Sequence, residues 1–427
     1  MSIGLMLLMF VILTLVGLPV GFTIGFSSLL FIVAGDFPVT LMSQRLFVSM
    51  DSFALLSLPM FIFAGNLMNI SGITDRLWIF SRVLFGRVRG AAGFVSVFTS
   101  MIFAAMSGSA LATAGGLGPI QFKGMIEDGY NGDDAAAIIA SGATMGPIIP
   151  PSIVFVLYGV AAGVSVGRLF LAGVIPGIFM GIAVGSYVFY LVYKNKEQYK
   201  IHEKPKGKDY INGLIAGIGP LFAPLIILGG IFSGIFTPTE AATIAALYAL
   251  VLGIIYKEIT FKNFIKCVKD TAKTSAGIMI IIGFAGSFSW VLTSMGASKL
   301  FLDFVTGITD SKILILILLN IGLLIVGLFI ETNSAVILLT PLMAPAMEAL
   351  GVDLVHFGMI LCVNLLIGIL TPPMGMALYV TSNVTKVPFG DIVKKVIPFI
   401  LVLLIVQLAV TFIPSLSLTL PNLVMGK

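Results

Sequence analysis

Long apolar runs, separated by short polar stretches, recur along the chain from Leu5 to Ile413. A run of about 20 residues crosses roughly 30 Å of hydrocarbon when it forms a helix that rises 1.5 Å per residue. The runs do not alternate with period two, so they do not indicate the strands of a membrane barrel. The pattern therefore predicts an all-α, polytopic membrane protein.

Two pairs of apolar segments are joined by short polar tips. Residues 91–106 and 110–127 flank Ser107-Gly108-Ser109, and each arm is short for a full crossing, so we expect a re-entrant hairpin. A second hairpin is expected from Lys312 to Leu350, with its tip at Glu331-Thr332-Asn333-Ser334. Both hairpins would enter the membrane without crossing it.

Each hairpin is followed by a helix that proline interrupts, because proline lacks an N–H group and clashes within a continuous helix. The breaks are expected at Gly146-Pro147-Ile148-Ile149-Pro150-Pro151-Ser152 and at Gly368-Ile369-Leu370-Thr371-Pro372-Pro373. The other expected elements are closing helices at about 170–193 and 396–417, crossings at 213–235 and 238–256, and interfacial arm helices at 37–51 and 261–273. Residues 5–34 form either one long helix or two short ones broken at Gly17-Leu18-Pro19-Val20-Gly21.

Glycine and proline positions repeat along the chain at one offset of 222 residues. The matching pairs are Pro119 and Pro341, Gly129 and Gly351, Pro150 and Pro372, Pro151 and Pro373, and Pro176 and Pro398. Such a repeat indicates two copies of one structural unit. The polar stretch 194–212, which carries six lysines, is then the linker between them.

Basic residues gather in a few loops. Because short cytoplasmic loops are enriched in Lys and Arg, these loops predict the orientation of the chain in the membrane. The clusters lie at 76–89, 194–208, 257–273 and 386–395, and all four fall on one side if the two repeats are inverted. We therefore expect a cytoplasmic linker, a periplasmic arm in repeat 1 and a cytoplasmic arm in repeat 2.

Composition narrows the class of protein. Of the 427 residues, 58% are hydrophobic and only 10% are charged, and the mean hydropathy is +1.12. Two separated cysteines and two histidines offer neither a disulfide framework nor a transition-metal cluster. The formal charge of +5 comes from loop residues, so it does not predict nucleic-acid binding. Because no Lys or Arg precedes Arg45, the first apolar run is expected to be retained rather than cleaved as a signal peptide.

Four backbone breaks near mid-depth predict a ligand site, because irregular backbone inside a membrane must face protein or a watery cavity. Hydroxyl, amide and carbonyl oxygens suit sodium, and half-helix N-termini suit an anion. We expect one sodium site per repeat: Ser107, Gly108, Ser109, Gly146 and Pro150 in the first, and Glu331, Thr332, Asn333, Gly368 and Thr371 in the second.

The same residues allow simpler interpretations. Glycine, serine and proline at the breaks would also serve only to kink and pack helices. Glu331, whose repeat mate is Ser109, would coordinate a cation, carry a proton, or cap the second arm of its hairpin. These alternatives stay open at the level of sequence.

Taken together, four motifs carry a resemblance. They are Ser107-Gly108-Ser109-Ala110-Leu111-Ala112-Thr113-Ala114, the first proline break, Phe236-Thr237-Pro238-Thr239-Glu240-Ala241-Ala242, and Thr371-Pro372-Pro373. In this order and at this length the chain resembles the large membrane subunit of tripartite ATP-independent periplasmic (TRAP) transporters. The likeness covers nearly the whole chain.

The resemblance implies a sodium-driven importer of organic acids, such as dicarboxylates or sialic acid, in a bacterial inner membrane. It implies no enzyme activity and no cofactor beyond Na⁺ as coupling ion, and two protein partners: a small four-helix membrane subunit and a periplasmic substrate-binding protein. Because no such domain precedes Met1, the small subunit is expected as a separate chain. The substrate is expected to contact Ser109, Pro151, Ser152, Ser334 and Pro373.

The family's elevator mechanism implies a division into moving and fixed parts. The fixed scaffold would comprise residues 1–90, which include the periplasmic arm, and residues 213–311, which include the cytoplasmic arm. The moving transport domain would comprise residues 91–193 and 312–427, and residues 194–212 would form the linker. Two alternatives remain. One is a stand-alone sodium- or proton-coupled organic-anion symporter that needs no binding protein. The other is a membrane-embedded enzyme, for which no set of acid, base and nucleophile is visible.

Overall fold

The computed structural model describes residues 3–201 and 207–426, and every regular element in this part of the chain is a helix. The first repeat contains α1 Ile3–Leu15, α2 Val20–Ala34, α3 Thr40–Met50, the 3-10 helix η1 Phe53–Leu56, α4 Ser57–Ile70, α5 Ile73–Phe85, α6 Ala91–Ser107, α7 Ala110–Glu127, α8 Gly132–Ala143, α9 Ile153–Ala162 and α10 Val166–Lys194. The second contains α11 Gly207–Phe232, α12 Pro238–Ile255, α13 Phe261–Ser294, α14 Ala297–Ile308, α15 Lys312–Phe329, α16 Thr332–Ala349, α17 Leu354–Gly368, α18 Met376–Thr385, α19 Phe389–Phe412 and α20 Ser415–Met425.

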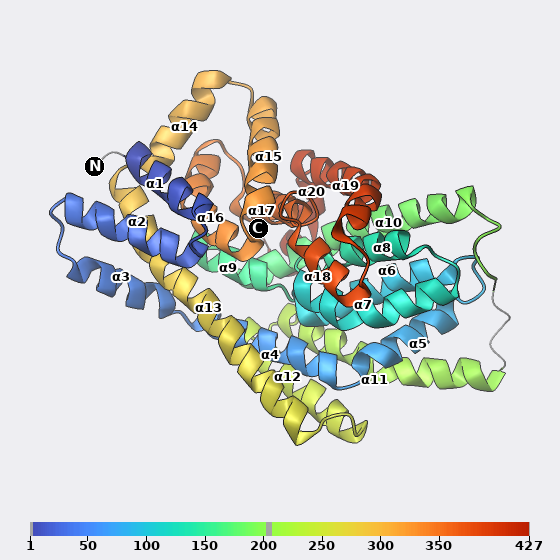
Figure 1. Ribbon diagram of the computed structural model, residues 1–427. Coiled ribbons are helices and arrows are strands. Elements are labelled where there is room, and N and C mark those ends of the chain that lie inside the picture. The colour runs from blue at the N-terminus through green and yellow to red at the C-terminus, as the bar shows by residue number, and fades with distance from the viewer. Residues whose placement is uncertain (1–2, 202–206, 427) are drawn as a thin grey trace.

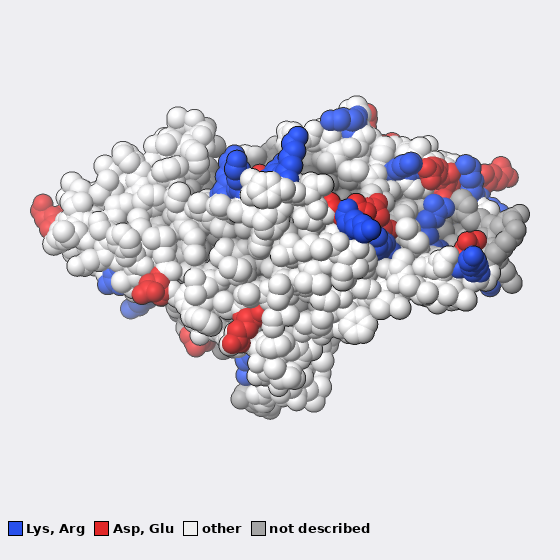
Figure 2. Space-filling model, turned by 90° about the horizontal axis from the view of Figure 1, so that it is seen from below, with Lys and Arg blue, Asp and Glu red and all other residues white. Residues whose placement is uncertain are grey.

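The membrane class is confirmed. Among the described residues, seven helical segments are long and apolar enough to cross a bilayer: η1 with α4, α10, α11, α12, α13, α15 and α19. Figure 2 shows broad uncharged surfaces, with charged side chains gathered toward the end of the molecule where α5, α10 and α11 meet the linker. Uncharged flanks of this kind are what a hydrocarbon environment requires.

Both predicted hairpins and both predicted breaks are present in the expected order. The pairs α6–α7 and α15–α16 form the hairpins, α8–α9 and α17–α18 form the broken helices, and α10 and α19 close the two units. The Pro150–Pro151 and Pro372–Pro373 peptide bonds are both cis. The N-terminal residues form two short helices and not one long helix. The first helix ends at Leu15 and the second begins at Val20, directly after Pro19.

Three boundaries differ from expectation. The arm expected at 261–273 is not a separate helix, because α13 runs unbroken for 34 residues where the first repeat has α3, η1 and α4. Pro59 lies in the first turn of α4, whereas its mate Ile281 sits within α13 and allows the helix to continue. The second closing helix begins at Phe389 and ends at Phe412, not at 417, because Pro414 cannot extend it and α20 follows.

The two hairpins also differ in how they pack. The arms α6 and α7 contact each other and α8, whereas α15 lies mainly against α17, and α16 lies against α9, α13 and α14. In Figure 1 the first hairpin occupies the right of the view together with α8, α18 and α19, and α2, α3 and α13 form the left flank. The second hairpin is therefore the more open of the two.

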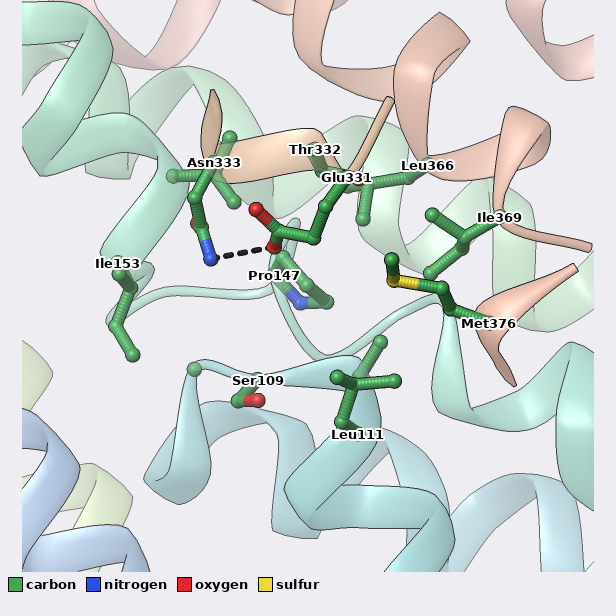
Figure 3. Close-up of a pocket in the computed structure, with 13 residues that line it drawn as sticks. Ser109, Leu111, Pro147, Ile153, Glu331, Thr332, Asn333, Leu366, Ile369 and Met376 are labelled. Atoms are coloured by element: carbon green, nitrogen blue, oxygen red, sulfur yellow. Dashed lines mark hydrogen bonds between the residues drawn. The ribbon is translucent and has the colours of Figure 1, made fainter. Parts of the chain in front are cut away.

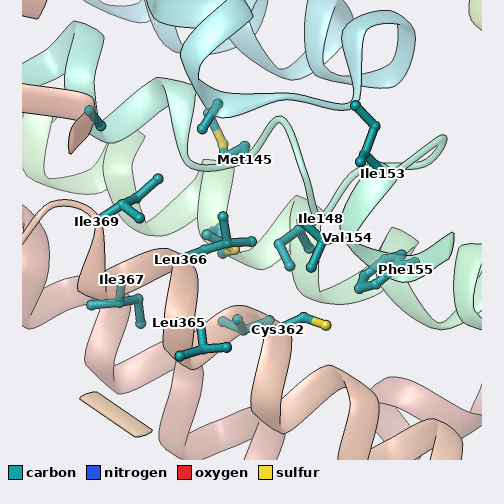
Figure 4. Packing of buried hydrophobic residues seen from close by; sticks show 14 of the residues in the cluster. Met145, Ile148, Ile153, Val154, Phe155, Cys362, Leu365, Leu366, Ile367 and Ile369 are labelled. Carbon is teal, nitrogen blue, oxygen red and sulfur yellow. The ribbon is translucent and has the colours of Figure 1, made fainter. Parts of the chain in front are cut away.

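The broken helices of the two repeats share one core. Figure 4 shows Ile148 of the first break and Val154 and Phe155 of α9 packing beside Cys362 and Leu366 of α17. At the far end of the same contact, the Tyr158 hydroxyl donates to the carbonyl of Leu354 at 2.6 Å. This shared core holds the two breaks at fixed positions relative to each other.

The start of the linker lies against the base of the first hairpin. The Lys200 N–H donates to the Asp128 carbonyl at 3.1 Å, and the Gln198 amide donates to the Gly129 carbonyl at 2.9 Å. The Tyr199 ring packs against the Tyr130 ring at an interplanar angle of 54°. Asp128 is buried and pairs with Arg82 of α5 at 3.4 Å. The linker residues His202, Glu203, Lys204 and Lys206 lie outside the described residues.

Candidate functional site

The first hairpin tip is built from a left-handed glycine and a capping serine. Gly108 ends α6 with φ near +60°, and the Ser109 hydroxyl accepts a hydrogen bond from the Ala112 N–H at 3.3 Å, which caps α7. A Cβ at Gly108 would lie 2.7 Å from the carbonyl oxygen of Pro151, and one at Gly146 would lie 3.0 Å from the Ser109 carbonyl. The first tip and the first break therefore touch backbone to backbone.

The second tip is capped by a carboxylate. Glu331 precedes α16 and accepts hydrogen bonds from the Ser334 N–H at 3.1 Å, the Ser334 hydroxyl at 3.4 Å and the Asn333 side-chain amide at 2.7 Å. The capping interpretation of Glu331 is thus confirmed. Cation coordination and proton transport by the same carboxylate remain predictions, because capping leaves acceptor capacity on both of its oxygens.

Two oxygens at this tip lack partners. Thr332 Oγ1 and Asn333 Oδ1 are buried and accept or donate no hydrogen bond within the part of the chain that the structure describes. Unpaired buried oxygens are costly, and a hard cation or a water molecule would satisfy them. Residues of the second predicted sodium set therefore offer the donor chemistry that the prediction requires.

The two tips meet across one small cavity of about 50 Å³ (Figure 3). Ser109 and Leu111 lie on one wall, and Glu331 and Asn333 lie on the other, with Pro147 of the first break between them. The caps of α7 and α16 both border this space, so two positive helix ends and one carboxylate surround it. Gly108 and Ser109 of the first predicted sodium set thus face Glu331, Thr332 and Asn333 of the second across a common space.

Several predicted site residues are turned elsewhere. Ser152 is fully buried, where it donates to the Pro147 carbonyl and accepts from the Phe155 N–H at 3.2 Å to cap α9. Thr371 donates to the Ile367 carbonyl at 3.0 Å, and Gly368 lies against Gly327 of α15. Pro150, Pro151, Ser152, Gly146, Gly368, Thr371 and Pro373 line neither the small cavity nor the larger one described next.

A larger cavity of about 890 Å³ extends from the tips to α2, α4 and α13. Ser107, Ser109, Glu331, Asn333 and Ser334 form its tip side. Its opposite wall carries four polar residues that the sequence does not predict as site residues: Asn66, Asp270, Lys273 and Thr274. The available signal is an aspartate and a lysine three residues apart at the start of the apolar part of α13, and the sequence alone assigns them only to a basic cytoplasmic cluster.

A second group that the sequence did not reveal is a buried amide cluster joining α15, α17 and α19. Asn320 Oδ1 accepts from the Asn364 amide at 2.8 Å, the Gln407 amide at 2.6 Å and the Thr411 hydroxyl at 3.4 Å. All four side chains are buried. The cluster fixes how these three helices pack beneath the second tip.

Comparison with known proteins gives a consistent result. Residues 7–416 match the family model described as the tripartite ATP-independent periplasmic transporter, DctM component. The chain is 40% identical over 412 residues to the sialic acid TRAP transporter large permease protein SiaM of Vibrio cholerae, covering 96% of each chain. It is 37% identical over 381 residues to the C4-dicarboxylate TRAP transporter large permease protein DctM of Pseudomonas aeruginosa, covering 88% of each. The crystal structure of the Alcanivorax borkumensis YdaH transporter, reported to have an unusual topology, has a TM-score of 0.62 at 14% identity and 86% coverage of both chains.

Proposed function

This chain belongs to the DctM family of large permeases of TRAP transporters, and on that basis we propose that it is the membrane subunit of a sodium-coupled importer of small organic acids. The observation that carries the proposal is the meeting of the two hairpin tips at one cavity, where oxygen donors and two helix N-termini face the same space. A cation and an anion are both suited to such a space.

Sodium binds first in this proposal. The unpaired oxygens of Thr332 and Asn333, together with the Glu331 carboxylate, supply hard ligands at the second tip, and the Ser109 hydroxyl with nearby carbonyls supplies them at the first. The bound ion then offsets the negative charge of Glu331, and the substrate carboxylate docks against N–H groups near Ser109 and Ser334. Ser152 supports the site from within the first break by holding α9 in place.

Transport proceeds by an elevator movement of the hairpins and broken helices, residues 91–193 and 312–427, against the remaining helices. The partners are a small four-helix membrane subunit and a periplasmic binding protein, in a bacterial inner membrane. Support comes from the family model, which describes a tripartite periplasmic transporter with DctM as one component. A stand-alone sodium- or proton-coupled symporter is the alternative, and uptake that needs no binding protein would favour it.

The proposal is tested by the thermal stability of the detergent-purified protein in sodium against potassium at equal ionic strength. A ligand that binds only the folded state stabilises it by about 2.7 kcal/mol at a hundredfold excess over its Kd. We expect a sodium-specific rise in the melting temperature that Ser109→Ala diminishes.

Ser165→Ala is the matched control, because Ser165 caps α10 in the same way, accepting from the Arg168 N–H at 3.4 Å. Equal melting temperatures in the two salts, in a protein that transports its substrate, would contradict sodium coupling. Equal loss of the sodium response in both serine variants would show that the effect of Ser109→Ala is only a capping effect.

A further inference from the structure

Hydrogen bonds link two serines and a threonine at the first hairpin tip. The Thr113 hydroxyl donates to the Ser109 carbonyl at 2.8 Å, and its oxygen lies 3.0 Å from the hydroxyl oxygen of Ser107. A carbonyl has no hydrogen to donate, and a threonine hydroxyl has only one. That hydrogen is used at Ser109, so the Ser107 hydroxyl must donate its own hydrogen to Thr113.

This direction decides what each serine can offer to a ligand. The hydrogen of Ser107 is used on Thr113, and no group within the described part of the chain donates to the Ser107 hydroxyl oxygen, so Ser107 can only accept. The Ser109 hydroxyl oxygen accepts from the Ala112 N–H at 3.3 Å and keeps a hydrogen that it can donate. The Ser107 hydroxyl therefore suits a cation and cannot donate to an anion, whereas Ser109 can donate to one.

The helix ends agree with this division. Ser107 is the last residue of α6, and Ser109 is the N-cap of α7. The C-terminal end of a helix carries a partial negative charge that attracts cations, and the N-terminal end attracts anions. Both serines line the larger cavity. The hydrogen-bond directions set by Thr113 thus match the electrostatics of the helix end on which each serine lies.

Thr113 is held inside the first hairpin and away from both cavities. The exposed fraction is 1% for Thr113 and 2% for Ser107, so water does not compete for the hydrogen bond between them. The Thr113 N–H also donates to the Ser109 carbonyl at 3.0 Å, which leaves that carbonyl with both lone pairs in use. Thr113 lines neither cavity, so any effect that it has on a ligand passes through Ser107.

The second hairpin has no equivalent arrangement. At the repeat offset of 222 residues, Phe329 and Ala335 correspond to Ser107 and Thr113. The acceptor at the second tip is the Glu331 carboxylate. An ionised carboxylate carries no hydrogen, whereas a hydroxyl presents its oxygen to a cation only when its hydrogen points elsewhere. A residue that directs the hydrogen is therefore needed in the first repeat alone.

We propose that Thr113 is a positioning residue for the first sodium site. It takes the hydrogen of Ser107 and gives its own to the Ser109 carbonyl, and this fixes the Ser107 hydroxyl oxygen as a sodium ligand. The inference rests on the proposed function, because it assumes that sodium binds at the first tip. It adds a residue that contacts neither ion nor substrate and determines which of the two the Ser107 hydroxyl serves.

The test is a sodium titration of the melting temperature of the full-length, detergent-purified protein, with potassium keeping the ionic strength constant. Thr113→Val removes the hydroxyl and keeps the branched shape. The net contribution of one neutral hydrogen bond corresponds to roughly a threefold to tenfold change in an equilibrium constant, and the sodium midpoint should rise by about that factor. Thr113→Ser keeps the hydroxyl and should stay within about twofold of the wild type.

A double-mutant cycle tests whether Thr113 acts through Ser107. Ser107→Ala removes the ligand itself and should raise the sodium midpoint at least as much as Thr113→Val does. Adding Thr113→Val to Ser107→Ala should then change the midpoint by less than about twofold, because the group that Thr113 positions is already absent. A Thr113→Val effect that persists in full without the Ser107 hydroxyl would overturn the inference.

Thr99→Val is the matched control. Thr99 is a fully buried threonine of α6 whose hydroxyl donates to the Val95 carbonyl at 2.6 Å, and it lines neither cavity. This variant should lose stability in potassium and keep the wild-type sodium midpoint. An equal rise of the midpoint in Thr99→Val and Thr113→Val would overturn the inference, because loss of packing would then explain both.

The remaining outcomes separate this inference from the proposed function. A wild type that responds to sodium, with an unchanged midpoint in Thr113→Val, would overturn the role of Thr113 and leave sodium coupling standing. A wild type that does not respond to sodium would contradict the proposed function and this inference with it. If Thr113→Val does not fold, Thr113→Ala also removes the hydroxyl and provides the same comparisons.

Discussion

Glu331 serves as a helix cap and borders both cavities, so its charge and its capping role need to be separated by substitution. Glu331→Gln keeps an oxygen that can accept from the Ser334 N–H but removes the negative charge, whereas Glu331→Ala removes both. Losing a cap costs about 0.5–2 kcal/mol of stability, so Glu331→Ala should fall in that range in potassium. Glu331→Gln should lose less than about 1 kcal/mol.

The effect on sodium binding should be larger than the effect on stability. A unit charge about 4 Å from an ion contributes roughly 4 kcal/mol at an effective dielectric constant near 20. Part of this is offset because the carboxylate must be desolvated in the wild type, and about 1.4 kcal/mol corresponds to a tenfold change in Kd. We therefore expect Glu331→Gln to raise the Kd for sodium at least tenfold.

The assay is a sodium titration of the melting temperature, with potassium keeping the ionic strength constant. Glu240→Gln is the control, because Glu240 caps α12 in a capping box with Thr237 and lines neither cavity. It should lose some stability and keep the wild-type sodium midpoint. An unchanged midpoint in Glu331→Gln would refute the reasoning and leave Glu331 with a capping role alone.

Three further substitutions test the packing around the site. Gly108→Ala should destabilise the protein by more than about 1 kcal/mol, because it places a Cβ 2.7 Å from the Pro151 carbonyl at a positive φ, while Gly185→Ala, with open space around it, should not; thermal unfolding compares the two. Asn320→Ala should cost about 1–3 kcal/mol in the same measurement, since three buried donors lose an acceptor, and a cost near zero would show that water replaces it. Asn333→Ala should reduce the sodium-induced rise in melting temperature more than Thr371→Ala does, because Asn333 lines both cavities whereas the Thr371 hydroxyl donates to the Ile367 carbonyl. A larger effect of Thr371→Ala would place the second sodium site at the proline break.

The sequence was most informative where structure is determined locally. Proline and glycine act on their own stretch of backbone, so both breaks and both tips lie within a residue or two of their predicted positions. Glu331 and Ser109 were identified because a polar residue between two apolar arms is a local signal. The repeat then placed each mate without further information.

Features that depend on how helices pack could not be predicted. Whether the two tips share one cavity depends on the joint core of α9 and α17, which joins residues far apart in the chain. Lys273 belongs to a cavity only because α13 passes the tips, and from its neighbours alone it resembles any basic residue at a membrane surface. Asn320, Asn364 and Gln407 are single polar residues in apolar helices, and no local spacing indicates that they meet.

The unbroken course of α13 makes the two repeats mechanically unequal. A helix of 34 residues is a rod about 51 Å long, and bending it would require breaking consecutive backbone hydrogen bonds. Its counterpart is jointed, because the extended Ser52 and the short η1 separate α3 from α4. The second repeat therefore has one stiff helix where the first repeat has two shorter helices that can bend at their junction. In the elevator scheme proposed above, the two end states would then not be mirror images of each other, and bending of the scaffold would be concentrated at residues 51–56.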